Sequence, residues 1–232
     1  MKILIICGHG AGDAGACALG YQEATLVREI APTLKNVLSK YADVTLFNPE
    51  QNMYKFLKAG NSFNFGVYDY VLELHFNAFN TKAYGTEILV RNLKEGISVE
   101  QMIVDNIARL GFTNRGVKKR SDLMNMNVCK KQGVPYALLE TCFVDNANDM
   151  KLYMSHKNEV IMAIANGIID GFGLKKNNDL NEYTDVNDIV WELAHRGIVS
   201  DKEGMINEMS LYPNGRLYWL ARKAVQYMRE HD

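Results

Sequence analysis

The sequence Lys-Ile-Leu-Ile-Ile-Cys-Gly-His-Gly at residues 2–10 decides the fold class. Its apolar run has the length of a strand that is buried on both faces, and it stops at a glycine. The run is too short for the apolar core of a secretory signal, and no small-residue cleavage site follows it. We therefore predict a first buried strand that leads directly into His9.

Further apolar runs alternate with helical patterns over residues 1–173. Strands are expected at 43–47, 68–76, 85–91 and 136–139, a helix or turn at 51–60, and helices at 24–40, at 98–110 with Ser98 as N-cap, and within 147–171. Nearly continuous apolar strands between amphipathic helices are typical of a mainly parallel sheet with helices on both faces. The expected fold class is therefore α/β.

The rest of the chain predicts a small appendage. Residues 174–183 are polar and rich in asparagine, as linkers are. Residues 184–232 carry two helical patterns around the turn Tyr-Pro-Asn-Gly at 212–215, so we expect a small all-helical C-terminal segment. A segment of this size holds little core of its own, and we expect it to dock on the first domain or on a partner.

Composition excludes several classes of function. The formal net charge is −1 and hydrophobic residues make up 47%, so neither nucleic acid nor a membrane is predicted as a partner. No stretch reaches the roughly 18 to 20 apolar residues of a membrane span. The four cysteines show no Cys-x-x-Cys spacing, and we expect all of them as free thiols: Cys7, Cys17, Cys129 and Cys142.

Three of the predicted strands run into a polar residue: His9, His75 and Glu140. Ligands of open α/β sheets bind outside the carboxyl ends of the strands, so these side chains are expected to meet at one edge. Two histidines and a carboxylate suit Zn²⁺ and leave a position open for water or substrate. Glu140 is the candidate proton acceptor, because desolvation at the end of a buried strand raises the pKa of a carboxyl group.

Glu23 and Glu73 each allow two interpretations. Glu23 shares a helical stripe with Leu26 and Val27, where a buried charge needs a partner or a cation. Alternatively, Glu23 is a carboxylate of a first helical turn that points to water. Glu73 has the strand parity of His75, so it either fixes the orientation of that ring or pairs with a lysine.

Other chemistries have weaker support in the sequence. No Gly-x-Ser-x-Gly elbow occurs, and no recognisable histidine pattern follows Cys142. The remaining histidines, His156, His195 and His231, lie at expected helix ends or in the tail, where surface and capping roles are commoner than metal binding.

Several of these residues stand in motifs that resemble a known family. The motifs, in chain order, are Cys-Gly-His-Gly at 7–10, Gly-Asp-Ala-Gly-Ala at 12–16, Glu23, Glu-Leu-His-Phe-Asn-Ala at 73–78, Asn-Arg-Gly-Val-Lys at 114–118 and Pro-Tyr-Ala-Leu-Leu-Glu-Thr-Cys-Phe-Val-Asp-Asn at 135–146. Over residues 1–173 they resemble the zinc-dependent N-acetylmuramoyl-L-alanine amidases of the amidase 3 type, and especially the catalytic domains of phage endolysins.

The resemblance implies a reaction and a set of roles. The reaction is hydrolysis of the amide between N-acetylmuramic acid and the L-alanine of the peptidoglycan stem peptide. The implied metal ligands for Zn²⁺ are His9, Glu23 and His75, with Glu140 as the catalytic carboxylate and Asn77 near the substrate. Arg115 matches an Arg-Gly element of the family, which gives it no assigned role.

The biological setting is a further expectation. The N-terminus favours a phage endolysin that is made in the host cytoplasm without a signal peptide and acts on the cell wall after release. A bacterial autolysin is the alternative. The rival functions are another zinc peptidase that acts on the stem peptide and a wall-binding protein without activity.

The C-terminal segment has its own resemblance. Trp-Glu-Leu-Ala-His-Arg-Gly-Ile-Val-Ser at 191–200 resembles part of an S-layer homology module, which implies a cell-wall ligand for residues 184–232. The alternative is a helical pair that packs on the first domain or forms a homodimer.

Overall fold

The computed structural model describes residues 1–94, 96–176, 190, 193, 198–201 and 205–206. The chain divides into two compact units, Met1–Lys176 and Asn177–Asp232, and the fold described below is that of the first unit. The predicted helical segment 184–232 and most of the predicted linker 174–183 lie outside the described residues, so both stay predictions. In the part of the chain that is described, no helix is long and apolar enough to cross a membrane.

The first unit is built on a six-stranded sheet with the strand order β4-β1-β5-β8-β6-β7. Strands β1, β4, β5 and β8 run parallel, β6 runs antiparallel to β8, and β7 is parallel to β6. The predicted mainly parallel α/β fold is therefore confirmed, with two strands reversed at one edge. The bounds are β1 (Lys2–Cys7), β4 (Asp43–Leu46), β5 (Tyr70–Asn77), β6 (Thr86–Val90), β7 (Asn114–Lys119) and β8 (Tyr136–Phe143).

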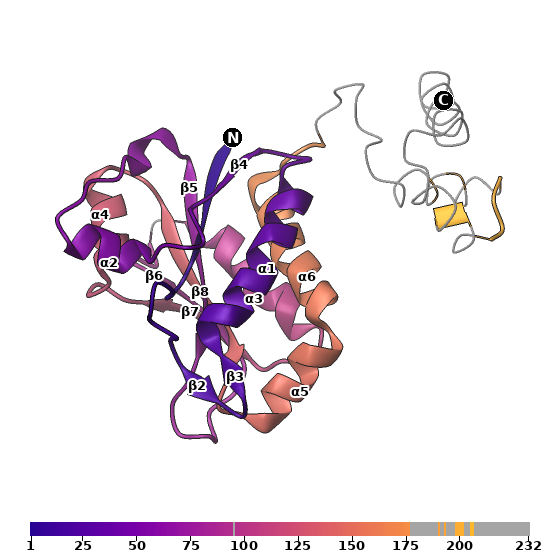
Figure 1. Ribbon diagram of the computed structural model, residues 1–232. Helices are drawn as coiled ribbons and strands as arrows, with labels where there is room; N and C mark the ends of the chain where they lie inside the picture. The colour runs from indigo at the N-terminus through magenta and orange to yellow at the C-terminus, as the bar shows by residue number, and fades with distance from the viewer. Residues whose placement is uncertain (95, 177–189, 191–192, 194–197, 202–204, 207–232) are drawn as a thin grey trace. The chain divides into compact units, whose positions relative to one another are not determined.

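Helices cover both faces of this sheet (Figure 1). One face carries α1 (Glu23–Leu38), α3 (Ser98–Ala108) and α6 (Lys157–Phe172), and the other carries the shorter α2 (Met53–Lys58) and α4 (Met124–Lys131). The remaining elements are the small hairpin β2 (Cys17–Ala18) and β3 (Tyr21–Gln22), the 3₁₀ turn η1 (Phe65–Val67) and α5 (Ala147–Ser155).

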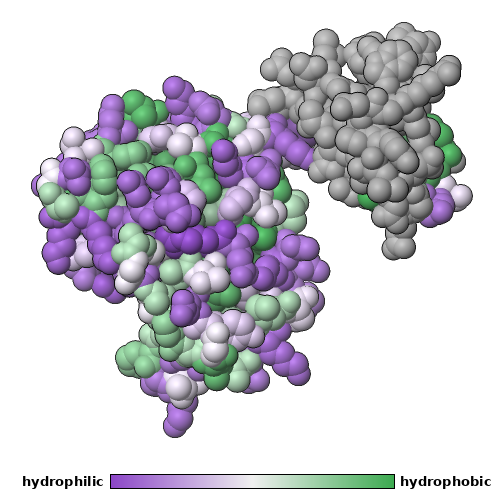
Figure 2. Space-filling view, in the orientation of Figure 1, coloured by the Kyte–Doolittle hydropathy of each residue, from purple (hydrophilic) through white to green (hydrophobic). Residues whose placement is uncertain are grey.

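Alternate residues of each strand supply two apolar cores. In β1, Ile3 and Ile5 belong to the core beneath α1, α3 and α6, whereas Leu4 and Ile6 belong to the core beneath α2 and α4. The outer surface of the first unit mixes hydrophilic and hydrophobic residues on the face shown in Figure 2. By strand parity, the α2/α4 side of the sheet also carries the polar residues of the candidate site.

Two local expectations differ from the structure. Ser98 is the first residue of α3 and not its cap: the N-cap position is Ile97, without a side-chain cap hydrogen bond. The carboxyl group of Glu100 interacts with its own backbone N–H in this first turn and accepts a bond from the Tyr70 hydroxyl, so a serine cap is not needed. Strand β7 was not predicted, because an edge strand needs few apolar residues and this one has only Val117.

Candidate active site

The carboxyl ends of β1, β5 and β8 meet at one edge of the sheet. Strand β5 lies between the other two: Cys7 pairs with Leu74 on one side, and His75 pairs with Glu140 on the other. His9 stands two residues beyond the end of β1. The structure thus brings His9, His75 and Glu140 onto three adjacent strands or their immediate ends.

Glu23, the first residue of α1, reaches both histidines. Its Oε1 lies 2.8 Å from Nδ1 of His75, and its Oε2 lies 3.1 Å from Nε2 of His9. The backbone N–H groups of Phe76 and Ala16 donate to the two oxygens at 3.0 and 2.9 Å. Because the residue is only 3% exposed, the interpretation of Glu23 as a water-facing carboxylate is wrong.

The three side chains fit a metal ion. His9, Glu23 and His75 each offer one donor atom, and these atoms lie within 4.8 Å of one another. The second ring nitrogen of each histidine faces a carboxylate: Nδ1 of His9 lies 3.0 Å from Asp13, and Nε2 of His75 lies 3.1 Å from Glu73. Such outer carboxylates orient metal-binding histidines, and the donor set suits Zn²⁺.

The charges of the cluster are strongly coupled. Burial acts to lower the pKa of His75 and His9, but the hydrogen bonds and charges of the surrounding carboxylates, with Glu23 foremost, together outweigh it and raise both values, that of His75 well above its usual range. Burial likewise acts to raise the pKa of Glu23, but the bonds to both histidines hold it far below its usual range. A cation bound here takes the place of protons on the histidines.

Glu73 supports His75, as one of its two interpretations predicts. It is 5% exposed, and besides His75 it accepts hydrogen bonds from the Asn125 amide at 2.8 Å and from the Tyr136 hydroxyl. The hydrogen bonds to His75, Tyr136 and Asn125 outweigh the effect of burial and lower its pKa. Among the described residues its partners are these three and no lysine, so the alternative of a lysine pair is not what this part of the chain shows.

The glycines of the motifs make room for the cluster. His9 itself adopts a left-handed φ of 57°, an unusual conformation for a residue with a side chain. A Cβ atom at Gly8 would lie 2.4 Å from Cε1 of His75, and one at Gly15 would lie 2.6 Å from Oε2 of Glu23. Both glycines are therefore required by close approach to the cluster.

Arg28 holds the loop that carries His9. From α1, its guanidinium donates to the carbonyls of Gly8 and His9 at 3.0 Å each, and its Nε donates to the carbonyl of Pro49 at 2.7 Å. The roles of Arg28 and Asp13 were not predicted from the sequence, although Asp13 stands in the motif Gly-Asp-Ala-Gly-Ala at 12–16. Neither role follows from residue type alone, because both depend on how the loop folds back.

Glu140 lies beside the cluster with one oxygen free for chemistry. Its Oε2 is buried and has no hydrogen-bond partner among the described residues. Burial, only partly offset by the charge of His75, raises its pKa to about 7, in the direction predicted from the sequence. A buried polar atom without a partner needs an explanation, and at Glu140 the neighbouring His-Glu-His cluster offers a catalytic one.

A second network, which was not predicted from the sequence, lies next to Glu140. Glu87 of β6 stands directly opposite Glu140 of β8 and is 7% exposed. It accepts hydrogen bonds from the amide of Asn77 at 3.1 Å and from Arg115 and Lys118 at 2.5 Å each. The sequence feature that could have revealed Glu87 is its position as a charged residue inside the apolar run Thr-Glu-Ile-Leu-Val.

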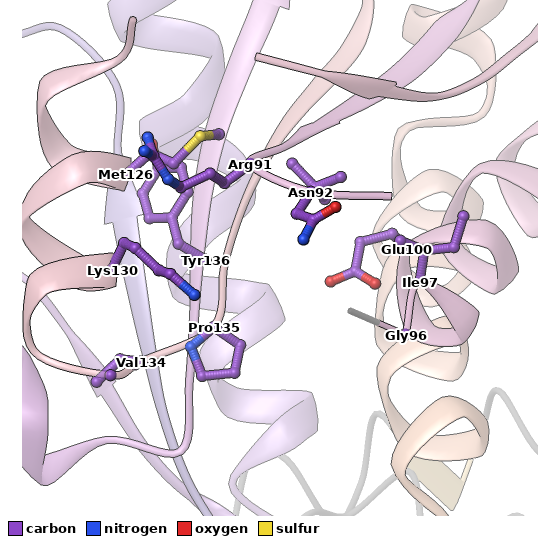
Figure 3. A pocket seen from close by; sticks show the side chains of 12 residues that line it. Arg91, Asn92, Gly96, Ile97, Glu100, Met126, Lys130, Val134, Pro135 and Tyr136 are labelled. Atoms are coloured by element: carbon purple, nitrogen blue, oxygen red, sulfur yellow. The ribbon is translucent and has the colours of Figure 1, made fainter. Parts of the chain in front are cut away.

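Two hollows lie near the α2/α4 side of the sheet. One of about 270 Å³ opens beside His9 and His75, with Glu73, Asn125 and Tyr136 among its lining residues. The other, of about 180 Å³, lies at the amino end of β8, where the side chains of residues such as Arg91, Glu100 and Lys130 surround it (Figure 3). Only the first contains candidate metal ligands, so it marks the candidate site.

Among the described residues, no other sequence candidate joins the cluster of His9, Glu23 and His75. All four cysteines are free, as predicted. Burial raises the pKa of Cys7 to about 11 and puts that of Cys142 well above its usual range, which agrees with the rejection of cysteine chemistry. His156 is the cap residue between α5 and α6 and lies 3.8 Å from Glu159. His195 and His231 lie outside the described residues.

Fold and site together define an α/β domain with a His-Glu-His cluster suited to a metal ion, beside a buried carboxyl group. Residues 3–170 match the family model Amidase_3, described as N-acetylmuramoyl-L-alanine amidase. The match covers well over half of the chain, and the chain belongs to this family.

Similar proteins include an autolysin and an amidase of two bacteria. The chain is 31% identical to the "Probable autolysin PH" of Staphylococcus aureus over 165 residues, which cover 64% of this chain but 34% of that protein. It is 30% identical over 183 residues to the N-acetylmuramoyl-L-alanine amidase CwlM of Bacillus licheniformis, covering 76% and 71%. The chain thus spans about a third of the length of the staphylococcal protein.

A solved structure extends the comparison to an endolysin. The catalytic domain of the CD27L endolysin, which targets Clostridia difficile, superposes with a TM-score of 0.60 at 28% identity. The superposition covers 77% of this chain and 99% of that domain.

Proposed function

We propose that this protein hydrolyses the amide bond between N-acetylmuramic acid and the L-alanine of the peptidoglycan stem peptide. The observation that carries the proposal is the position of Glu140, whose buried and unpartnered Oε2 lies next to a cluster suited to Zn²⁺. Family membership indicates which bond is cut. In this proposal His9, Glu23 and His75 hold the metal ion.

The proposed chemistry divides between the ion and the protein. Zn²⁺ held here supplies a Lewis acid that polarises the substrate carbonyl and makes water more acidic. Glu140 accepts a proton from the attacking water and delivers it to the alanine nitrogen as the amide breaks. A pKa raised by burial to about 7 suits a group that must both accept and donate a proton near neutral pH. Asp13 and Glu73 keep the two histidine rings oriented.

We also propose that Asn77 lines the substrate side of the site. Its amide nitrogen bonds to Glu87 at 3.1 Å, and its Oδ1 accepts from the backbone N–H of Ala78 at 2.9 Å. Asn77 therefore fixes the start of the loop after β5 at the edge where Glu140 lies, and it connects that loop to the Glu87 network.

The proposed setting is a lytic or autolytic system acting on the cell wall. We favour an endolysin, because the solved catalytic domain of the CD27L endolysin is 28% identical to this chain, and we propose that it reaches the wall after synthesis in the host cytoplasm. The staphylococcal relative keeps an autolysin as the alternative. We further propose that residues 1–173 form the catalytic domain and that residues 184–232, after a linker at 174–183, bind a wall ligand.

The reaction is tested on purified Gram-positive cell walls. The expected products are new L-alanine amino termini without new reducing sugars, and Glu140→Gln is expected to keep zinc and lose turnover. New reducing ends contradict the amidase, and mass spectra showing cleavage inside the stem peptide support the rival zinc peptidase. Wall binding without any bond cleavage supports the non-catalytic rival.

The role of the C-terminal segment has a separate test. Wall binding by the full chain is compared with that of residues 1–176, and sedimentation of both forms gives their oligomeric state. A loss of binding in the shorter form supports the wall ligand. A change from dimer to monomer, with wall binding retained, supports the homodimer.

A further inference from the structure

Arg115 and Lys118 both contact the carboxylate of Glu87, although in a regular strand their side chains would point to opposite faces of the sheet. Side chains alternate along a strand, so residues three apart point to opposite faces. Both cations nevertheless contact Oε2 of Glu87. They do so because β7 has a register shift: Thr86 pairs with Asn114 but Ile88 pairs with Val117.

The shift is a β-bulge that re-aims one side chain. Two residues of β7, Arg115 and Gly116, stand opposite the single residue Glu87, and Gly116 has a φ of 76° that favours glycine. Bulges next to active sites commonly redirect a side chain in this way. Here the bulge turns Arg115 to the side of the sheet on which Lys118 and Glu140 lie.

The two cations outnumber the carboxylate they contact. Glu87 is the carboxylate that both cations contact, and Asp149 also feels the charge of Arg115 from a greater distance. The side chains of Arg115 and Lys118 remain 31% and 41% exposed. The Arg115 guanidinium is also held over the ring of Phe143, 4.9 Å from its centroid, and donates to the carbonyl of Tyr84 at 3.3 Å. The result is a positioned, partly exposed positive site with Glu87 as its support.

The distance from Glu140 defines what this site can reach. Neighbouring strands lie about 4.8 Å apart, so β7 lies about 10 Å from β8. In the stem peptide, L-alanine is followed by a glutamyl residue whose α-carboxyl group is free in some cell walls and amidated in others. An extended chain covers about 3.5 Å per residue, so this group lies roughly 7 Å from the cleaved amide. The roughly 7 Å from the cleaved amide to this carboxyl group, together with the length of an arginine or lysine side chain, spans the distance of about 10 Å between β8 and β7.

We propose that Arg115 and Lys118 bind the free α-carboxylate of the second residue of the stem peptide, and that Glu87 is the residue that positions them. This inference rests on the proposed amidase function. A fork of guanidinium and ammonium donors is the chemistry that recognises a carboxylate, and a neutral carboxamide lacks the charge for the same bonds.

The test compares two muropeptides that differ only in whether this α-carboxyl group is free or amidated. The wild-type protein, loaded with zinc, is expected to show a kcat/KM at least about tenfold higher for the free acid. Lys118→Gln and Arg115→Gln are each expected to remove most of this preference, lowering kcat/KM for the acid about tenfold and changing that for the amide by about twofold or less. Arg115→Lys, which keeps the positive charge, should retain part of the preference for the free acid that Arg115→Gln removes.

Lys119→Gln is the matched control. It removes the same charge from the next position of β7, which pairs with Val90 and faces the opposite side of the sheet. Its acid-to-amide ratio is expected to equal that of the wild-type protein. Zinc content and circular dichroism of each variant show that the site and fold are intact.

Three outcomes overturn the inference and a fourth concerns the function itself. If the wild-type protein cleaves both muropeptides equally well, or if the variants lower both rates by the same factor, the cations only stabilise Glu87. If Lys119→Gln changes the ratio as much as Lys118→Gln, the effect is general charge attraction. If neither muropeptide nor cell walls are cut at the lactyl–alanine amide, the proposed amidase function fails first.

Discussion

Replacing Glu23 with glutamine tests whether the cluster is a metal site built around one buried carboxylate. Glu23 interacts through its two oxygens with both histidine rings and accepts bonds from the backbone N–H groups of Phe76 and Ala16. Glutamine has the same shape but only one acceptor oxygen. Its NH₂ group must then face one of the two backbone donors.

The expected loss follows from these contacts. Hydrogen bonds that involve a charged group contribute roughly 1.5–3 kcal/mol, and a buried donor left without a partner costs about 1–3 kcal/mol. The histidines offset part of this, since a neutral ring can accept from the new NH₂ group. We therefore expect Glu23→Gln to lower the free energy of unfolding of the metal-free protein by about 2–4 kcal/mol at pH 7. Zinc affinity should fall by more than about 100-fold, because losing an outer partner alone costs about 10–100-fold.

Glu29→Gln is the matched control on the same helix. Its carboxylate is 43% exposed and pairs with Lys157, so the same substitution there should change the unfolding free energy by less than about 0.5 kcal/mol. Urea unfolding is followed by far-ultraviolet circular dichroism, because both tryptophans, Trp191 and Trp219, lie beyond the first unit. Zinc affinity is measured by competition with a chelator. If the two variants match in both quantities, the assigned role of Glu23 is refuted.

Three further predictions concern the same cluster. Asp13→Asn should weaken zinc binding about 10–100-fold with the fold intact, because it loosens the His9 ring; unchanged affinity in a chelator competition contradicts this role. Burial acts to lower the pKa of His9 and His75, but the hydrogen bonds and charges of Glu23 and the other nearby carboxylates together outweigh it and raise both values, so zinc uptake near neutral pH should release protons from the two rings. Calorimetry in two buffers of different ionisation enthalpy measures this release, and zinc affinity should fall as the pH is lowered; uptake without proton release is the opposing result. Glu140 must be ionised to accept a proton, so kcat/KM should rise with pH, with an apparent pKa below about 7 because the bound cation favours the carboxylate. A profile that is flat between about pH 5 and 7 speaks against Glu140 as the base.

The convergence of His9, His75 and Glu140 could be predicted from the sequence because it depends on strand direction alone. Apolar runs locate the strands, and the carboxyl ends of neighbouring parallel strands share an edge. Glu23 could not be decided in the same way. Helical periodicity places it over the buried stripe, but its inward turn depends on the loop before α1, where its N–H donates to the carbonyl of Ala16 at 2.9 Å. That contact is tertiary and leaves no local pattern.

The reversed edge of the sheet could not be predicted for a related reason. Strand β6 has an apolar run like that of a parallel strand, and nothing in Thr-Glu-Ile-Leu-Val specifies that it pairs antiparallel with β8. Because of this pairing, Glu87 lies opposite Glu140, and because of the bulge in β7 two cations reach Glu87. The acid–base part of the site was therefore predictable, whereas the Glu87 network depends on pairing direction and register.

The charge of the cluster links the fold to the proposed metal ion. The buried carboxylates Glu23 and Glu73 face His9 and His75, so without a metal ion their charges are balanced only while both rings carry a proton. Buried charges without full compensation destabilise a fold. A divalent cation supplies this positive charge and removes the need for protonated rings, so zinc binding and stability of the first unit are expected to be linked. On this reasoning, the carboxylates behind the histidines both orient the ligands and make the site dependent on its ion.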